Sequence, residues 1–112
     1  MPCVHEFGII PEFDPDSEEY EEYEPERYGC IAVEDDLLLG VFDRLRDLDT
    51  YWHRGDRPAK GFAYCGITLL PAASLPAFLA ELQREGDPEL LPLGEKIREA
   101  IRQGKYMIHY GL

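Results

Sequence analysis

Histidines near the two ends of the chain are the residues best suited to acid–base chemistry. His5 precedes Glu6 in the segment VHEFGII, and His109 lies in the closing segment KYMIHY. Histidine changes charge close to neutral pH, so an imidazole beside a carboxylate can accept and donate protons. If the two segments form paired strands, His5, His109 and a carboxylate converge. A histidine on a strand is more often a hydrogen-bonded structural residue, so we keep both as candidate ligand-binding residues and assign no catalytic residue.

The segment 50–60, TYWHRGDRPAK, is the most chemically crowded loop of the sequence. It contains the only tryptophan, Trp52, together with His53, Arg54 and Arg57. Two arginines could clamp an anion while an aromatic ring stacks on it. The alternative is a surface crossover whose rings pack down and whose charges pair with each other. These four residues are the other candidate ligand-binding residues.

Sequence motifs of enzymes and metal sites are absent. The chain has no G-x-S-x-G, G-x-x-x-x-G-K-[ST], G-x-G-x-x-G or H-E-x-x-H. Cys3, Cys30 and Cys65 are odd in number and widely spaced, which predicts reduced cysteines in the core. A metal site joining Cys3 and His5 to Cys65 or His109 is the alternative, but no C-x-x-C or H-x-x-x-H pair supports it. We therefore predict no metal and no cofactor.

The negative charge is concentrated in the first third of the chain. Residues 1–36 contain 13 Asp and Glu against one arginine, whereas residues 37–112 contain 10 acids and 10 bases. Phosphate groups are bound by clustered lysine and arginine, so this distribution opposes binding to nucleic acid and to anionic membranes. It favours a basic partner.

The acidic loop, residues 11–27, carries most of this charge. Its core EFDPDSEEYEEYEPE holds nine acids and no base in 15 residues, and two prolines interrupt any helix. Its three aromatic residues could anchor an exposed loop on the domain, with one short helical turn pinning two of them. The sharper interpretation is a docking surface that combines acidic steering with tyrosine anchors. The candidate partner-binding residues are Asp16, Glu18, Glu19, Tyr20, Glu21, Glu22 and Tyr23.

Hydrophobic periodicity predicts four strands and three helices. Residues 4–10, 28–33, 61–71 and 105–110 have strand patterns, and the central one, GFAYCGITLLP, is apolar on both faces. Helices are predicted over 35–49, from Ser74 to Gly86, and from about 92 to Gly104, with 34–36 capping and charging the first one. The predicted fold is a single α+β domain, 1–112, with about four strands in a mixed or antiparallel sheet and three helices on one face.

The uncharged stretch from 61 to 80 is interrupted by two prolines and several turn residues, so it predicts a strand and a helix and not a membrane span. The start of the chain, MPCVHEFGII, lacks the basic region and cleavage site of a secretory signal. We expect a cytoplasmic protein.

Four segments together resemble a family of small bacterial proteins of unassigned function: HEFGII at 5–10, YEPERY at 23–28, RP…GFAYCGIT at 57–68 and KYMIHYG at 105–111. The likeness covers most of the chain but implies no catalytic residues. In size and charge the chain is also similar to immunity proteins, which neutralise basic toxins.

These observations predict a non-enzymatic, immunity-like binding protein that recognises a basic protein partner. The alternative is a small enzyme or ligand-binding domain that uses the histidines and arginines of the 50–60 loop or of the terminal strands. A homodimer formed through an open sheet edge is a third hypothesis.

Overall fold

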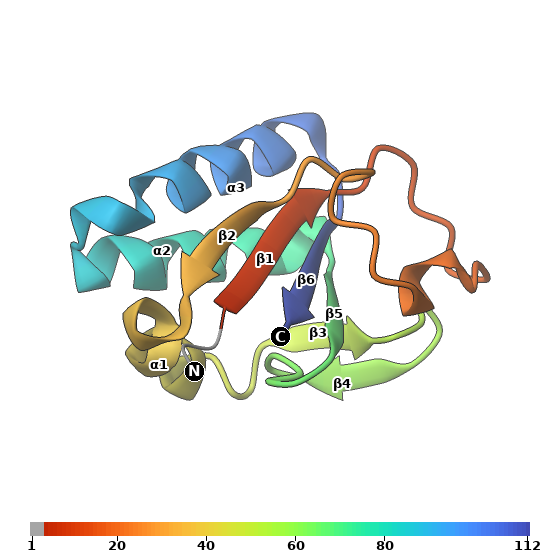
Figure 1. Cartoon of the computed structure of the whole chain (residues 1–112), viewed down its shortest axis with the longest axis horizontal. Coiled ribbons are helices and arrows are strands. Elements are labelled where there is room, and N and C mark those ends of the chain that lie inside the picture. Colours follow the sequence, from red (N-terminus) through yellow and green to blue (C-terminus); the bar gives the residue numbers. More distant parts are fainter. Residues whose placement is uncertain (1–3) are drawn as a thin grey trace.

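In the computed structural model, which describes residues 4–112, the first and last strands of the chain lie side by side within one antiparallel sheet (Figure 1). This pairing fixes the closing segment in the sheet, as its alternating pattern predicts. The strand order is β2-β1-β6-β5-β3-β4. The strands are β1 (Val4–Ile9), β2 (Ile31–Glu34), β3 (Asp49–Trp52), β4 (Pro58–Lys60), β5 (Ile67–Leu70) and β6 (Met107–Gly111).

The sheet has six strands where the sequence predicts about four, because the 50–60 loop is a hairpin. Its strands β3 and β4 pair Thr50 with Ala59 and Tyr51 with Pro58. These strands are too short to show a clear alternating pattern, and Pro58 argues against a strand. Pairing of Tyr51 with Leu69 of β5 holds the hairpin on the sheet, and Pro58 is tolerated because β4 lies at the edge.

The central strand β5 is shorter than predicted and begins at Ile67, not at Gly61. Gly61 has a φ of +69°, which a side chain would disfavour, and starts a turn. The Thr68 hydroxyl then accepts the backbone N–H of Ala63, at 2.8 Å, and closes the 61–66 loop back on the strand. Within β5 the predicted alternation is confirmed, since Leu69 and Leu70 belong to hydrophobic clusters on opposite faces.

Three helices form as predicted, with differences at their starts and ends. They are α1 (Asp35–Arg44), α2 (Leu75–Glu85) and α3 (Leu91–Gln103). Gly86 and Gly104 end α2 and α3 in the left-handed conformation, as expected of C-terminal glycines. The prediction that α1 continues to residue 49 is wrong: the helix ends at Arg44, and Asp49–Trp52 form β3, which pairs with β4 and β5. Ser74 precedes α2, but its hydroxyl donates to the carbonyl oxygen of Asp49 and does not cap the helix.

All three helices cover one face of the sheet, as predicted. Their apolar stripes meet Phe7 of β1, Leu70 of β5 and Met107 of β6 in one buried cluster. Among the residues described, no helix is long and apolar enough to span a membrane. The helical residues buried there are Leu38, Val41, Leu75, Phe78, Leu82, Leu93, Ile97 and Ala100, and Leu45 joins them directly after α1.

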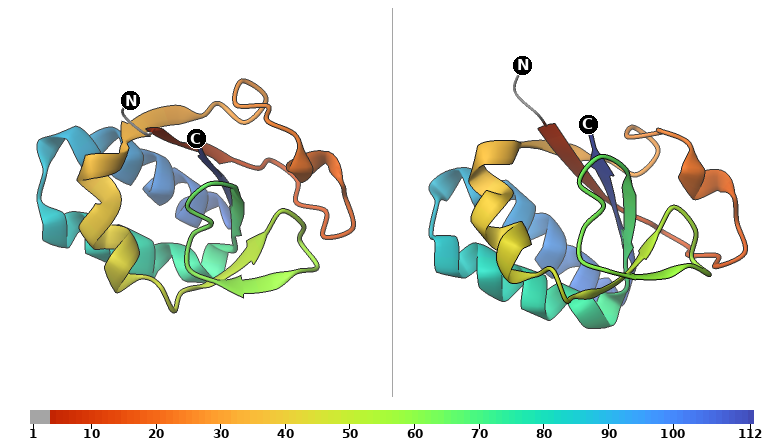
Figure 2. Two further views of the ribbon diagram at one scale, coloured as in Figure 1. Left: turned by 60° about the horizontal axis from the view of Figure 1, so that its bottom comes forward. Right: turned by 90° about the horizontal axis from the view of Figure 1, so that it is seen from below.

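The acidic segment, residues 11–30, covers part of the opposite face. Figure 2 shows this orange segment on the side of the molecule away from the helices. Tyr20 and Tyr28 pack there against Leu69, Ile108 and Tyr110 of the sheet. The segment is therefore a folded layer of the domain.

Candidate functional site

The structure brings the two terminal histidines into contact. The strand register places Phe7 opposite His109 and His5 opposite Gly111, so the two histidines are diagonal neighbours on the helix-facing side of the sheet. Nδ1 of His5 lies 2.8 Å from Nε2 of His109. Both side chains are fully buried, at 0% exposure, and their rings stack with centroids 5.0 Å apart. The predicted convergence of His5 and His109 is thus confirmed.

The carboxylate beside the pair belongs to Asp35, which was expected to cap and charge the start of the first helix. Oδ1 of Asp35 lies 2.7 Å from Nε2 of His5, and Oδ2 accepts the phenolic hydroxyl of Tyr64 at 2.6 Å. Glu34 is the N-cap residue of α1, and its side chain makes no capping hydrogen bond. Because both Asp35 oxygens are engaged elsewhere, the predicted capping role is wrong for this residue.

Glu6, the neighbour of His5 in sequence, faces the other side of the sheet. Successive residues of a strand point to opposite faces, so the carboxylate beside His5 in the sequence cannot reach its ring. Glu6 instead accepts the hydroxyl of Tyr23. This hydrogen bond raises the pKa of Tyr23 to about 12.

The hydrogen-bonded chain ends on β5. Nδ1 of His109 lies 3.1 Å from the hydroxyl of Thr68, which also accepts the backbone N–H of Ala63. The chain therefore runs from Tyr64 through Asp35, His5, His109 and Thr68 to the residue preceding Tyr64. We call these five side chains the histidine network.

Burial determines the electrostatics of the histidine network. Loss of solvent, and then the neighbouring His5 ring, hold the pKa of His109 well below its usual range. The hydrogen bond from Tyr64, followed by that from His5, lowers the pKa of Asp35. The aromatic rings of Phe7, Phe42 and Phe62 pack around His109 within 5.0–5.6 Å. An ionised Asp35 and a neutral His109 follow from this environment.

The network reaches the surface only at the Asp35 and Tyr64 end. The Asp35 side chain is 14% exposed and Tyr64 is 44% exposed, whereas His5, Thr68 and His109 are 0% exposed. A bound molecule outside the domain could touch the first two but neither histidine. Both histidines are thus hydrogen-bonded inside the core, out of reach of a ligand at the surface.

The candidate ligand residues of the 50–60 loop lie in the β3–β4 hairpin, where Trp52 is the cross-strand neighbour of Thr68 on β5. Trp52 is half-buried, and its indole N–H donates to the carbonyl oxygen of Gly61 at 3.0 Å. Arg54 has carboxylates of Asp56 and Glu18 at 3.3 and 3.8 Å. Arg57 is exposed, and His53 adopts a φ of +67° with its ring against Gly66. Arg54 already faces two carboxylates. The hairpin therefore fits the interpretation of a surface crossover with paired charges better than that of an anion clamp.

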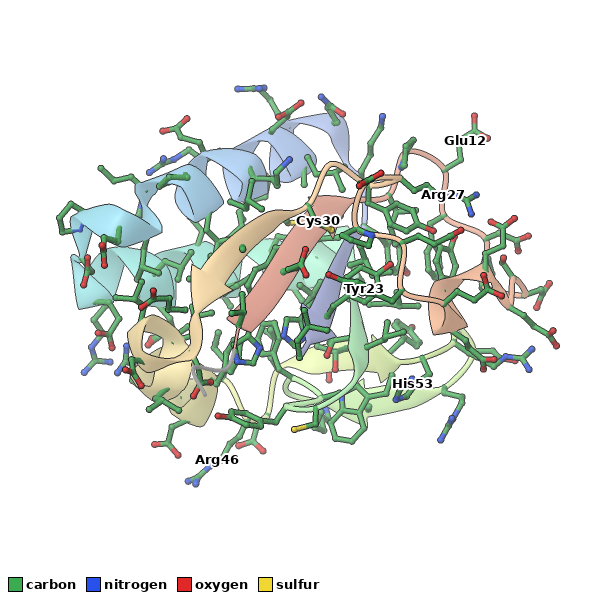
Figure 3. The ribbon with its side chains drawn as sticks, in the orientation of Figure 1. Glu12, Tyr23, Arg27, Cys30, Arg46 and His53 are labelled. Carbon is green, nitrogen blue, oxygen red and sulfur yellow. The ribbon has the colours of Figure 1, made fainter. Side chains whose placement is uncertain are left out.

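The acidic segment is anchored by rings and exposes its carboxylates. The ring of Phe13 stacks between those of Tyr106 and Tyr20, with centroids 3.6 and 5.5 Å away. A single 3-10 turn, Glu19–Glu21, carries Tyr20 inward, where 2% of the residue is exposed and its hydroxyl accepts the N–H of Asp14. Figure 3 shows Glu12 pointing away from the domain. The exposed acids of the segment are Glu12, Asp14, Asp16, Glu18, Glu19, Glu21, Glu22 and Glu26.

Tyr23 differs from Tyr20 because it remains accessible. It is 52% exposed while its ring packs edge-on against Tyr110, and Figure 3 shows it lying over the sheet. Of the two predicted tyrosine anchors, only Tyr23 can meet a partner. Tyr20 is instead part of the internal packing.

Two of the three cysteines lie in the part of the chain that the structure describes, and both are free thiols. Cys30 is half-buried, and burial raises the pKa of its thiol to about 12. Cys65 is exposed in the 61–66 loop, so the prediction that it lies in the core is wrong. Cys3 falls outside the described residues. In the chain from residue 4 onward, no three histidine, cysteine or acidic residues are arranged to hold a metal ion.

Comparison with known proteins finds no matching family model, no matching curated protein and no matching solved structure. The resemblance to the small bacterial family therefore stays a prediction. The geometry of the acidic segment and of the histidine network supports the functional proposals that follow.

Proposed function

We propose that the protein is a non-enzymatic binding protein whose acidic segment docks on a basic surface of a protein partner. The observation that carries the proposal is the anchoring of this segment by Phe13, Tyr20 and Tyr28. A surface whose shape is set before binding loses less conformational entropy on association than a disordered tail does. The exposed carboxylates of the acidic segment therefore present a fixed pattern of negative charge.

The proposed surface retains most of its charge. Arg27 pairs with Glu19 and Glu24, and Arg54 approaches Glu18 at 3.8 Å. These two arginines offset only part of the nine acids in the segment. Tyr23 adds an accessible aromatic ring, a residue type that often anchors interfaces. The proposed docking residues are Asp16, Glu18, Glu19, Glu21, Glu22 and Tyr23.

We extend the proposal to an immunity-like mechanism, in which the segment covers a basic active-site cleft of a toxin. The support is the combination of a large excess of acid, −12 in total, with an accessible tyrosine within the acidic surface. Charge complementarity of this kind accelerates encounter and selects basic partners. A cytoplasmic location belongs to the same proposal, since Cys30 and Cys65 are both free thiols.

The test is affinity capture from the lysate of the protein's own host at low and high salt, with quantification of the captured proteins. The informative variant is Glu21→Lys combined with Glu22→Lys, because both side chains are exposed and Glu19 is already paired with Arg27. The matched control carries Asp36→Lys and Asp47→Lys, which make the same change in charge at exposed positions in and after α1, away from the acidic segment (Figure 1).

We expect one stoichiometric basic partner whose capture falls by about tenfold or more in the Glu21 and Glu22 variant or at high salt. High salt weakens the interaction because the screening length shortens from about 8 Å to about 3 Å between 0.15 M and 1 M. Equal capture by the two charge variants would refute the proposal. Light scattering of the unbound protein separates it from self-association through the open edge of β2, which would appear as a dimer.

A further inference from the structure

The position of every proton in the histidine network follows from its hydrogen-bonding partners. An ionised Asp35 only accepts hydrogen bonds, so Nε2 of His5 carries a proton. In a neutral His5 the other nitrogen, Nδ1, is then an acceptor, and Nε2 of His109 must donate to it. Nδ1 of a neutral His109 is likewise bare and accepts the hydroxyl of Thr68. The Thr68 oxygen is free to accept the N–H of Ala63.

All hydrogen bonds of this chain consequently point toward one carboxylate. The backbone N–H of Ala63 and the hydroxyls of Thr68 and Tyr64 are the donors at its two ends. Each buried nitrogen of the two rings has one partner, and no proton is shared or missing. The neutral pair with an ionised Asp35 is therefore a completely satisfied arrangement.

One additional proton can be held in only two ways, and both reach Thr68. If His5 becomes the cation, its Nδ1–H donates to Nε2 of His109, whose own proton must move to Nδ1. If His109 becomes the cation, its Nδ1 is protonated directly. In either case Nδ1–H of His109 faces the Thr68 oxygen at 3.1 Å, and the Thr68 hydroxyl must turn away. Proton uptake by the histidine pair thus changes the hydrogen bond at the Thr68 end of the network.

A second additional proton has no place in the network. Two cationic rings with nitrogens 2.8 Å apart would repel strongly in a buried setting. Among residues 4–112, the ionisable groups that contact the pair are Asp35 from α1 and Tyr64 from the 61–66 loop. Contacts from β1, α1 and the start of the 61–66 loop are the apolar rings of Phe7, Phe42 and Phe62. One carboxylate can balance one positive charge.

We infer that His5 and His109 together form a binding site for a single proton, which enters through Asp35 and Tyr64 and reverses the hydrogen bond between His109 and Thr68. The inference is independent of the proposed docking function. Both ends of the network attach to the same loop, at Ala63 and Tyr64. Proton uptake therefore changes the hydrogen bonds that hold the 61–66 loop at Ala63 and Tyr64. The exposed residues of this loop are Tyr64 and Cys65.

The test is an NMR titration of the intact protein labelled with ¹⁵N and ¹³C in histidine. At pH 8 we expect both His5 and His109 to carry their proton on Nε2. On acidification, the pair should take up one proton in a single step, with Nδ1 of His109 becoming protonated. His53 is not a member of the pair and supplies reference signals. Two separate uptake steps, or a proton on Nδ1 of His109 at pH 8, would overturn the inference.

Variants at the entrance test the direction of the coupling. Asp35→Asn removes the balancing charge, so we expect the affinity of the pair for its proton to fall by about tenfold or more, which lowers the midpoint by at least about one pH unit. Tyr64→Phe leaves Asp35 with one donor fewer, so the midpoint should rise. Asp36→Asn, at the exposed neighbouring position, is the matched control and should not move it. Equal midpoints in all three variants would overturn the inference, and Tyr64→Phe alone decides if Asp35→Asn does not fold.

Discussion

Replacing Thr68 by valine tests how much the histidine network contributes to stability. Thr68 is 0% exposed, and its hydroxyl joins the N–H of Ala63 at 2.8 Å to Nδ1 of His109 at 3.1 Å. Valine has nearly the same shape, so Thr68→Val leaves no cavity but leaves both of these buried groups without a partner. Each unpaired buried group costs about 1–3 kcal/mol, so we expect a loss of about 2–6 kcal/mol in the free energy of unfolding.

The matched control is Thr68→Ser, which keeps the hydroxyl and loses one methyl group. Deleting one buried methyl costs about 0.5–1.5 kcal/mol, so Thr68→Ser should be clearly more stable than Thr68→Val. Urea unfolding at pH 8, where His109 is neutral, measures both differences. A domain of this size has about 5–15 kcal/mol of stability in total, so the valine variant should be severely destabilised.

A Thr68→Val variant within about 0.5 kcal/mol of the wild type would refute this expectation, because two buried groups left unpaired should cost more than that. The expectation would also be refuted if serine and valine were equally harmful, since the loss would then come from packing and not from the hydroxyl. A valine variant that fails to fold beside a stable serine variant lies at the upper end of the expected range.

Two further predictions concern pH and the close approach of the chain at the end of β6. The pKa of His109 is lower in the folded state than the value of about 6.5 in the unfolded chain, so the unfolded chain binds more protons below that pH. Urea unfolding should therefore show full stability above about pH 7 and a loss as the pH falls below 6.5; equal stability at pH 8 and 5 would contradict this. At Gly111 an added Cβ would lie 2.0 Å from the carbonyl oxygen of Tyr64, whereas at Gly94 of α3 the nearest atom is 3.8 Å away. Thermal unfolding should show Gly111→Ala destabilised by about 1–3 kcal/mol and Gly94→Ala stabilised by up to about 1 kcal/mol, and the reverse order would show that the approach at Gly111 is not tight.

The histidine network could be predicted only in part, because its members are far apart in sequence. Its hydrogen bonds join residues separated by 104, 30 and 41 positions. Alternation along the terminal segments predicts that His5 and His109 share a face if their strands pair. It does not reveal which carboxylate reaches them, since that depends on where α1 begins above the sheet. Asp35 therefore looked like an ordinary acidic residue at the start of a helix.

The sequence by itself determined the elements whose signals are local. Apolar residues at helical spacing, with glycine at the ends, predicted α2 and α3, because backbone conformation and side-chain periodicity act within a few residues. The same local signals placed a short helical turn in the acidic segment and a strand at the end of the chain. They also placed the charge imbalance, which is a property of composition alone.

The tertiary structure decided which faces and edges meet. The hairpin β3–β4 exists because β5 offers it a partner, not because residues 49–60 have strong strand propensity. Tyr20 turned inward and Tyr23 stayed accessible because the sheet offers a hydrophobic surface to one ring and an edge-on contact beside Glu6 to the other. Contacts of this kind depend on long-range pairing and register, and a local pattern in the sequence carries no information about them.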